Sequence, residues 1–273
     1  MRIGKTEYTS PVVMGILNVT PDSFYAGSRT FDETAIRERV ETLVSEGADI
    51  IDIGAYSSRP GADEVSEAEE IDRLARGMSI VRDMAPTLPV SVDTFRATVA
   101  RTAVRDMGCD IVNDISGGLL DSAMPEIVAE LGCPYILTHM RGTPADMQSH
   151  AVYGDVTAEV IAELAERMAR FALAGVNDII IDPGFGFAKT LEQNYELMRN
   201  LKAFKILDRP ILVGISRKSM ITKLLGITPA EALNATTALN VCALDRGASI
   251  LRVHDVAAAK QAVAVWRGVK CEV

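Results

Sequence analysis

Cysteine and histidine are scarce in this chain, which has four cysteines and three histidines in 273 residues. The cysteines form no CxxC pair and have no histidines at zinc-finger spacing, which argues against a disulfide framework and against a structural zinc site. We therefore expect free thiols. The histidines, His139, His150 and His254, lie too far apart in the sequence to indicate a metal site by their spacing alone.

Long apolar runs and an excess of positive charge are also missing. No run is long enough to cross a bilayer, and the stretch Val12 to Leu17 is too short for the apolar part of a signal peptide and meets Asn18 at once. The formal net charge is -9, whereas a general nucleic-acid binder usually has a basic face. We expect a soluble, cytoplasmic protein without a membrane or nucleic-acid partner, in which local basic residues are still able to bind a small anion.

Eight short apolar runs, each typical of a buried strand, alternate with segments of helical apolar spacing. The runs cover residues 12–17, 49–53, 90–92, 110–112, 135–138, 178–181, 211–213 and 249–253. One helical segment begins with the capping-box pattern Ser66-x-x-Glu69 and continues with apolar residues at Ile71, Leu74 and Met78. Continuous apolar strands that alternate with helices predict a parallel sheet that is buried on both faces.

This alternation predicts the α/β class, and eight repeats favour a closed (β/α)8 barrel, or TIM barrel, over an open doubly wound sheet. Because no linker or low-complexity tract interrupts the chain, we expect a single domain over residues 1–273. The segments Ser57 to Val65 and Arg141 to Asp155 are typical of long, flexible loops. Both follow predicted strands, where barrel enzymes carry working residues at the C-terminal face.

Polar and charged residues follow almost every predicted strand. They are Asn18, Asp52, Asp93, Asn113, Asp114, His139, Asp182, Ser216, Arg217, Lys218, Arg252 and His254. For any one of them, such as Asp114, helix capping is the better explanation. Taken together they are expected to converge, because the carboxyl ends of barrel strands meet at one face.

The set divides into an acidic half and a basic half. Asp93, Asn113 and Asp182 have the groups to form in-plane hydrogen bonds with a heterocycle that carries amino and oxo substituents. Arg252, His254 and Asn18 suit an anionic leaving group or its metal ion. No Ser/His/Asp arrangement is evident, so a covalent acyl mechanism is disfavoured.

Two glycine-containing segments follow predicted strands. The segment Asp182-Pro183-Gly184-Phe185-Gly186-Phe187 ends an apolar run with a carboxylate and two glycines. It indicates either an ordinary turn or a pocket whose backbone approaches a flat ligand. The segment Gly214-Ile215-Ser216-Arg217-Lys218-Ser219 precedes a helical stretch. A helix start is able to hold a carboxylate or a phosphate, but basic residues there are also typical of solvated surface.

Several ordered motifs coincide with the ends of the predicted strands. They are Gly15 to Phe24, Ser58-Arg59-Pro60-Gly61-Ala62, Ser91-Val92-Asp93-Thr94, Asn113-Asp114-Ile115-Ser116-Gly117-Gly118, His139-Met140-Arg141-Gly142-Thr143-Pro144, Asp182 to Phe187, Ser216-Arg217-Lys218 and Arg252-Val253-His254-Asp255. Through these motifs the chain resembles the dihydropteroate synthase family, from about residue 10 to its end. Related pterin-binding methyltransferases share the barrel and parts of the pocket, but the Ser-Arg-Pro-Gly and Ser-Arg-Lys segments together favour the synthase.

The resemblance implies a transferase of folate biosynthesis that condenses a hydroxymethyldihydropterin diphosphate with p-aminobenzoate by a dissociative substitution. It also implies Mg2+ as cofactor, a homodimer, mobile first and second βα loops and a sulfonamide target. By resemblance, the catalytic residues are Asp93, Asp182 and Lys218, and the pterin contacts are these three with Asn113, Arg252 and Met140. The resemblance implies p-aminobenzoate contacts at Ser216, Phe24, Ser58, Pro60 and Phe185. It implies diphosphate contacts at Asn18, Arg59, Arg252 and His254, with Asn18 also as the metal ligand.

Some positions depart from the family's usual pattern. The second loop has Gly54-Ala55-Tyr56-Ser57-Ser58 where Gly-Glu-Ser-Thr is frequent, and the first loop has Tyr25-Ala26 where a more acidic, glycine-rich sequence is usual. These changes put loop motion and inhibitor response in doubt rather than the reaction class. Two alternatives stay open: a corrinoid-linked methyltransferase, which needs no diphosphate site, and a non-catalytic paralogue that binds pterin or supports a partner subunit.

Overall fold

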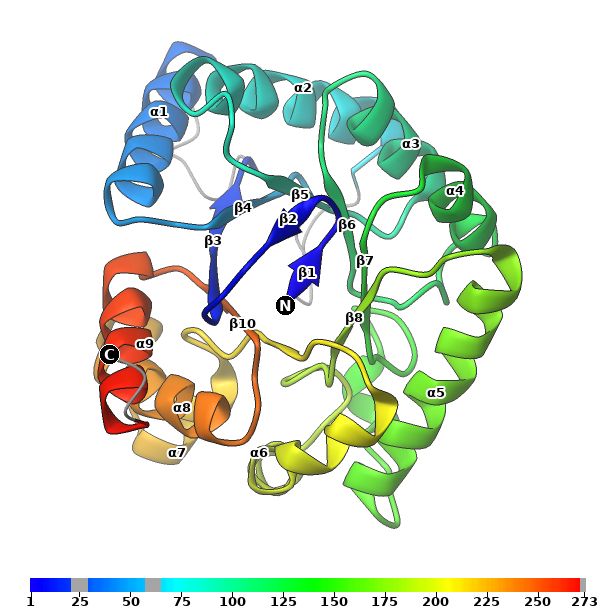
Figure 1. Ribbon diagram of the computed structural model, residues 1–273, viewed down its shortest axis with the longest axis vertical. Helices are drawn as coiled ribbons and strands as arrows, with labels where there is room; N and C mark the ends of the chain where they lie inside the picture. Colours follow the sequence, from blue (N-terminus) through cyan, green and yellow to red (C-terminus); the bar gives the residue numbers. More distant parts are fainter. Residues whose placement is uncertain (21–28, 57–64, 271–273) are drawn as a thin grey trace.

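Eight parallel strands form a barrel at the centre of the protein (Figure 1). The computed structural model describes residues 1–20, 29–56 and 65–270. Around the barrel the strands follow the order β8-β7-β6-β5-β4-β3-β10-β9, and a parallel bridge between Ile181 and Ile211 joins β8 to β9 and closes the ring. The strands are β3 (Val12–Asn18), β4 (Ile50–Gly54), β5 (Val90–Asp93), β6 (Ile111–Asp114), β7 (Tyr135–Thr138), β8 (Ile179–Asp182), β9 (Leu212–Val213) and β10 (Ile250–Val253). The predicted TIM barrel is confirmed.

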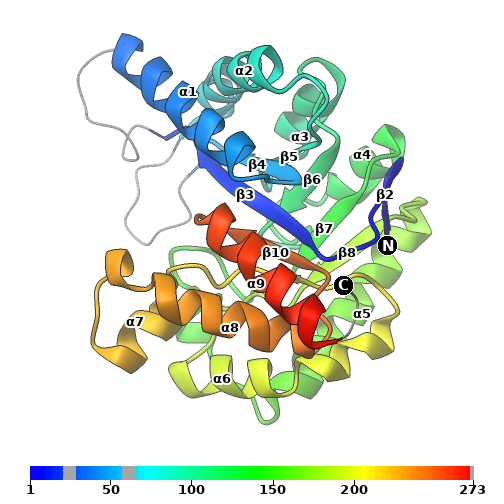
Figure 2. The same ribbon diagram turned by 60° about the vertical axis from the view of Figure 1, so that its left-hand side comes forward.

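Helices surround the strands on the outside, as Figures 1 and 2 show from two directions. They are α1 (Arg29–Ser45), α2 (Glu67–Met84), α3 (Ala97–Arg105), α4 (Met124–Leu131), α5 (Val156–Ala174), α6 (Leu191–Arg199), α7 (Ser219–Leu225), α8 (Leu233–Asp245) and α9 (Val256–Val269), with short 3-10 helices η2 (Met147–His150), η3 (Leu201–Leu207) and η4 (Pro229–Glu231). In the described part of the chain no helix is long and apolar enough to cross a membrane.

The interior of the barrel is apolar at its amino-terminal end. A buried cluster there contains Val12, Met14, Ile50, Ile111, Ile136, Ile180, Leu212 and Ile250, all from strands. A small hairpin of β1 (Arg2–Ile3) and β2 (Thr6–Glu7) lies across this end, and Ile3 packs onto the cluster. Sequence periodicity does not reveal the hairpin, because two-residue strands are too short to show an alternation.

A second, larger core lies between the strands and the helices. Outward-facing strand residues such as Val13 and Leu17 pack there against helical residues that include Val256 and Val263. Helix α2 begins at the predicted cap, where the Ser66 side chain accepts a hydrogen bond from the Glu69 backbone N–H at 3.2 Å. The expected return contact of a capping box is absent, because the Glu69 carboxylate pairs with Arg73 instead.

The two loops predicted to be long have different outcomes. Residues 57–64 of the first lie outside the described part of the chain. The second, Arg141 to Asp155, contains η2 and is tied to the barrel by several contacts, including the Arg141 side chain on the Val152 carbonyl and Gln148 Nε2 on the Gly186 carbonyl at 3.2 Å. The loop therefore packs against the segment that follows β8.

Candidate active site

Alternate residues of each barrel strand face the interior. Those near the amino-terminal end are apolar, and those near the carboxyl end are mostly polar. In β4, β5, β6, β8 and β10 the inward-facing residues nearest this end are Asp52, Asp93, Asn113, Asp182 and Arg252. Adjacent strands pair Asp93 with Asn113, which brings side chains from neighbouring strands to one level. The convergence expected from the sequence is confirmed for these residues.

One guanidinium joins two of the carboxylates. Arg252 Nε lies 2.6 Å from Asp52 Oδ2, and a terminal nitrogen of Arg252 lies 2.6 Å from Asp93 Oδ2. Burial raises the pKa of Asp93 to about 7; the Arg252 charge opposes this shift and the Asp52 charge adds to it. Asp93 therefore titrates near neutral pH, whereas Asp52 and Asp93 raise the pKa of Arg252 against the effect of burial and keep it charged.

Asp52 orders this part of the site, although the sequence indicated no role for it beyond its place near a strand end. Its Oδ2 atom accepts hydrogen bonds from both Arg252 and Asn113 Nδ2, the latter at 3.1 Å. Its Oδ1 atom and the Ser91 hydroxyl are buried and have no hydrogen-bond partner among the described residues. An aspartate inside an otherwise apolar strand was the available signal, because a buried carboxylate needs partners to offset its desolvation.

Asp182 and Lys218 form the opposite side of the site. Asp182 Oδ1 accepts a hydrogen bond from the Gly184 N–H at 2.8 Å, and Lys218 Nζ donates to the Phe185 carbonyl. Lys218 Nζ also lies 4.3 Å from the centre of the Phe187 ring. Burial raises the pKa of Asp182, which the Lys218 charge opposes, and burial lowers the pKa of Lys218 to about 8, which Asp182 opposes.

Ser216 and His254 are in direct contact. His254 Nδ1 lies 3.0 Å from Ser216 Oγ, and the same hydroxyl accepts the His254 backbone N–H at 3.2 Å. Burial and the charges of Arg252, Arg217 and Arg39 lower the pKa of His254 to about 4, so the imidazole is neutral at pH 7. A hydroxyl that donates to Nδ1 leaves the ring proton on Nε2, where it is available to an anion.

The segment expected to be a helix start is arranged differently. Helix α7 begins at Ser219 and is capped by Lys218, so Ser216 precedes the helix by three residues and does not form its amino terminus. Arg217 has a positive φ of 58° and forms a two-point ion pair with Asp255. The positive φ turns the chain between two residues that point into the site.

Arg39 on α1 is a further residue that sequence reasoning missed. One of its terminal nitrogens donates to the His254 carbonyl at 2.6 Å and to the Ile16 carbonyl at 3.1 Å. It thereby ties the carboxyl ends of β10 and β3 together. No pattern in the sequence distinguishes this arginine from a solvated helical residue, since the two carbonyls come from distant segments.

The remaining expected site residues have varied positions. Asn18 lies half-buried at the end of β3. The side chains of Phe185 and Met140 are fully buried, so contact of either with a ligand requires a side-chain rearrangement. Asp114 points outward and accepts hydrogen bonds from Ser116, Gly118 and Tyr135, so it holds a turn and does not cap a helix, which the capping alternative had predicted. Phe24, Ser58, Arg59 and Pro60 lie outside the described residues.

Known proteins match this geometry closely. The family model described as "Pterin binding enzyme" matches residues 14–254. The dihydropteroate synthase of Escherichia coli is 42% identical over 95% of this chain and 92% of its own length. A folate synthesis bifunctional protein of Arabidopsis thaliana is 42% identical over 89% of this chain, which spans about half (54%) of that longer protein. A Yersinia pestis dihydropteroate synthase, solved with a sulfonamide drug, superposes with a TM-score of 0.90, 35% identity and 99% coverage of both chains.

The barrel and its polar carboxyl end are thus those of a pterin-binding enzyme, and the chain belongs to the pterin binding enzyme family. Within that family, the E. coli and Y. pestis proteins that it resembles over nearly their whole length are dihydropteroate synthases.

Proposed function

We propose that this chain is a dihydropteroate synthase, a transferase that joins a hydroxymethyldihydropterin diphosphate to p-aminobenzoate in folate biosynthesis. The observation that carries the proposal is the convergence of Asp93, Asn113, Asp182, Lys218 and Arg252 at the carboxyl end of one barrel. This set combines in-plane hydrogen-bonding groups for a pterin with cations for a diphosphate. The family match and the E. coli relative support the same activity.

Asn113, Asp182 and Lys218 bind the pterin ring in this proposal. Asn113 Nδ2 is engaged by Asp52, so its amide oxygen is left to accept from a ring amino group. Asp182 uses Oδ1 for the Gly184 N–H and keeps Oδ2 for the ligand. A side-chain carbon at Gly214 would lie 3.8 Å from that Oδ2 atom, so the glycine leaves space beside it. The Lys218 ammonium group donates a hydrogen bond to an oxo group of the pterin ring.

The reaction begins with cleavage of the C–O bond between the pterin methylene and the diphosphate. The bonding electrons leave with the diphosphate oxygen, and the methylene carbon becomes cationic. The Asp93 carboxylate stabilises this cation, because a preorganised charge in a water-poor site acts more strongly than in bulk water. The amine nitrogen of p-aminobenzoate then forms the C–N bond and its surplus proton passes to water. An aryl amine is neutral at physiological pH, so no strong base is required.

The diphosphate is bound by the basic side of the site. Arg252 offers its charge, and the neutral His254 donates from Nε2 while Ser216 holds Nδ1. The negative charge that grows on the leaving oxygen is thereby offset by groups already in place. Arg59 completes this contact in the proposal from outside the described residues.

Mg2+ fits the same side of the site. The described residues contain no group of three or more His, Cys, Asp or Glu side chains that could form a metal cage. Mg2+ is commonly held by only one or two protein oxygens together with substrate phosphates, and the Asn18 carboxamide at the end of β3 is one such oxygen. When bound, the ion would add positive charge to the departing diphosphate.

p-Aminobenzoate lies toward Ser216 in this proposal. Its other proposed contacts are Phe185, after a rearrangement of that buried side chain, and Phe24, Ser58 and Pro60, which lie outside the described residues. The sulfonamide complex of the Y. pestis relative supports the proposal that sulfonamides occupy the same place. The contact between the Ser216 hydroxyl and His254 supports the proposal that this subsite lies beside that of the diphosphate. Adjacent subsites are what direct attack of the amine on the pterin methylene requires.

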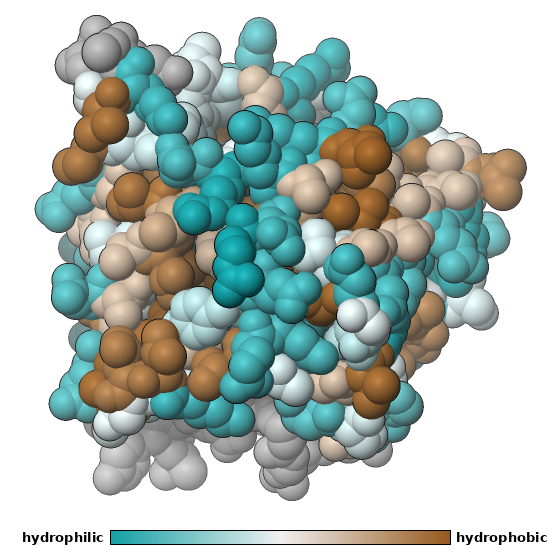
Figure 3. Space-filling view, turned by 90° about the horizontal axis from the view of Figure 1, so that it is seen from below, coloured by the Kyte–Doolittle hydropathy of each residue, from teal (hydrophilic) through white to brown (hydrophobic). Residues whose placement is uncertain are grey.

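We also propose a cytoplasmic homodimer. Val256 and Val263 on α9 face the core, so these two residues are not available to an interface. The opposite side of the same region exposes Val265, Val269 and, on α7, Leu224. Figure 3 shows apolar patches set among hydrophilic residues on one face of the molecule. Equilibrium sedimentation checks the stoichiometry.

The activity is tested with purified protein, the dihydropterin diphosphate and Mg2+, with and without p-aminobenzoate. Formation of dihydropteroate and diphosphate supports the synthase, and diphosphate release without the amine supports bond cleavage before attack. If pterin binds but neither product appears, the methyltransferase or the non-catalytic alternative replaces the proposal. Tighter pterin binding in the presence of diphosphate would then speak against the methyltransferase.

A further inference from the structure

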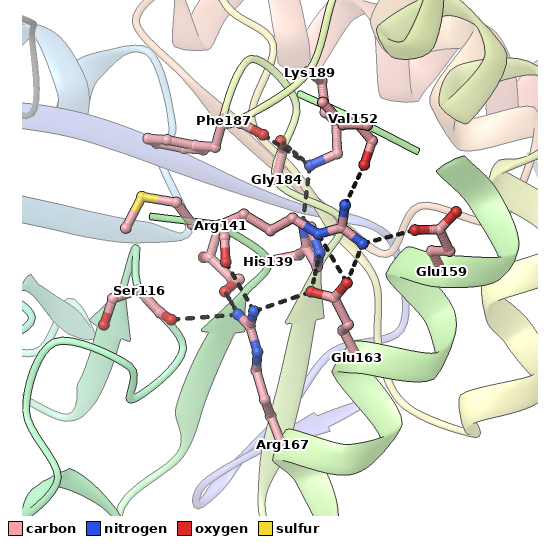
Figure 4. A network of polar contacts seen from close by, with 12 residues as sticks. Ser116, His139, Arg141, Val152, Glu159, Glu163, Arg167, Gly184, Phe187 and Lys189 are labelled. Carbon is pink, nitrogen blue, oxygen red and sulfur yellow. Dashed lines mark hydrogen bonds and ion pairs between the residues drawn. The ribbon is translucent and has the colours of Figure 1, made fainter. Parts of the chain in front are cut away.

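A lysine without contact to the proposed substrates is buried behind the site. Lys189 lies between β8 and α6, and the residue is only 3% exposed. Its Nζ atom is 2.9 Å from the Gly184 carbonyl, 3.0 Å from the Phe187 carbonyl and 3.0 Å from His139 Nδ1 (Figure 4). Burial lowers the pKa of Lys189, and the Asp182 charge opposes this. An ammonium has three N–H donors and no acceptor, so the three acceptors satisfy its charged form completely.

The contacts of His139 agree with this protonation. Its Nδ1 atom accepts from Lys189, so the ring proton is on Nε2, which donates to Glu163 Oε2 at 3.1 Å. Burial and the Lys189 charge lower the pKa of His139 to about 3, so the ring is neutral. Burial raises the pKa of Glu163, but hydrogen bonds from His139 and Arg141 outweigh it and bring the pKa to about 2.

Glu163 in turn anchors the network to the barrel wall. It lies on α5 and is bound by Arg141, whose Nε is 2.9 Å from Oε1, and by Arg167, 3.4 Å from Oε2. Arg167 also donates to the Met140 carbonyl at 2.8 Å. The chain of contacts from Lys189 therefore ends on a long helix and on the strand end of β7, which are fixed parts of the fold (Figure 4).

The segment held by Lys189 is the one that contacts the pterin-binding pair. In this segment the Gly184 N–H donates to Asp182, and the Phe185 carbonyl, which lies between the two clamped carbonyls, accepts from Lys218. Gly184 and Gly186 have φ values of 72° and 82°, so this turn lies outside regular secondary structure. Its own hydrogen bonds run from the Phe187 N–H to the Gly184 carbonyl at 3.1 Å and from the Gly186 N–H to Asn194 Oδ1 at 2.6 Å. Lys189 adds the contacts that hold the Gly184 and Phe187 carbonyls to one ammonium group.

We propose that Lys189 is a positioning residue, which clamps the Gly184 and Phe187 carbonyls and thereby sets Asp182 and Lys218 for pterin binding. This inference rests on the proposed function for the ligand but concerns a residue that does not touch it. It requires that loss of the Lys189 contacts change pterin affinity more than it changes the stability of the fold. Glu163 orients the His139 ring, and His139 accepts the third hydrogen bond of Lys189, so both residues act through Lys189.

The test compares Lys189→Met with Lys189→Gln and with the control Lys260→Met. Methionine keeps the length of the side chain and removes all donors, whereas glutamine keeps two donors. Lys260 pairs with Asp49 at 2.9 Å at the other end of the barrel, so its replacement removes a lysine without affecting the site. Calorimetry with the dihydropterin diphosphate measures affinity, and thermal unfolding measures Tm. The pH dependence of kcat/KM gives the basic limb of the profile, which is the fall in activity on the alkaline side.

We expect Lys189→Met to weaken pterin binding by roughly tenfold or more, with Lys189→Gln between it and the wild type. The methionine removes the Lys189 donor from the Phe187 carbonyl and from His139 Nδ1, and it leaves the Gly184 carbonyl only the Phe187 N–H. The basic limb should move upward from about 8. The Phe185 carbonyl that accepts from Lys218 lies in the turn held by Lys189, so displacement of this turn exposes Lys218 to water and returns its pKa toward the ordinary value. Lys260→Met should change neither quantity. A merely structural role predicts a lower Tm with unchanged affinity and an unchanged limb, and that result overturns the inference.

If Lys189→Met does not fold, Lys189→Gln decides by the same affinity measurement: weaker binding with a Tm near that of the wild type supports the clamp, and wild-type affinity overturns it. Failure of the proposed function is recognised separately, because it is measured as product formation by the wild-type protein. A wild type that binds pterin but forms no product contradicts the synthase while the comparison of pterin affinities still judges Lys189.

Discussion

Replacement of Asp52 by Asn should shift one limb of the pH profile and leave the other in place. The proposed mechanism needs Asp93 ionised and Lys218 protonated, so kcat/KM should fall as pH drops through about 7 and again as pH rises through about 8. Asp52 is among the charges that raise the pKa of Asp93, but it does not contribute to the shift of Lys218. The acid limb should therefore move down and the basic limb should stay.

The size of this shift follows from the shared guanidinium. At an effective dielectric constant of about 20, two like charges roughly 6 Å apart repel by about 3 kcal/mol, equivalent to about two pKa units. Arg252 binds both carboxylates at 2.6 Å and offsets part of that repulsion. We therefore expect the acid limb to move down by about one pH unit.

The assay is steady-state kcat/KM for the dihydropterin diphosphate between pH 5 and 10. Asp49→Asn is the matched control, because Asp49 is a carboxylate of the same β4 region that pairs with Lys260 away from the site. Asparagine is nearly isosteric and can still accept from Arg252 and Asn113 in place of Asp52 Oδ2. An acid limb that does not move, or an equal movement of both limbs, would refute the assignment of that limb to Asp93.

Further predictions concern single positions. Asp93→Asn should lower kcat by roughly a hundredfold to a thousandfold while pterin affinity changes much less, because the carboxylate acts on charge that develops during the reaction; equal losses in single-turnover rate and in calorimetric affinity would contradict this role. Gly184→Ala should destabilise the protein by more than about 3 kcal/mol in denaturant unfolding, because the added carbon would lie 1.9 Å from the His139 carbonyl oxygen at a φ of 72°. Gly132→Ala is its control, with a φ of 62° and nothing within 4 Å, and should cost only about 1 kcal/mol; equal costs would show that backbone strain alone accounts for the effect at Gly184.

Much of the barrel follows from local sequence patterns. Each of the eight expected strands is present within one or two residues of its predicted bounds. Runs such as residues 179–181 are apolar on both faces, and a parallel sheet covered by helices on both sides buries both. The convergence of Asp93, Asn113 and Asp182 follows equally from that topology. A residue at the carboxyl end of a barrel strand lies near the others whatever its exact contacts.

The sequence by itself therefore determined the barrel, its polar end and the family, because these depend on periodicity and on motif order along the chain. Only the tertiary structure decided which charges meet. That Arg252 joins Asp52 to Asp93, that Ser216 holds His254, and that Lys189 clamps the turn after β8 are contacts between segments distant in the sequence or between a side chain and backbone carbonyls. No local pattern encodes them, because a side chain's partners and its desolvation depend on how the whole chain packs.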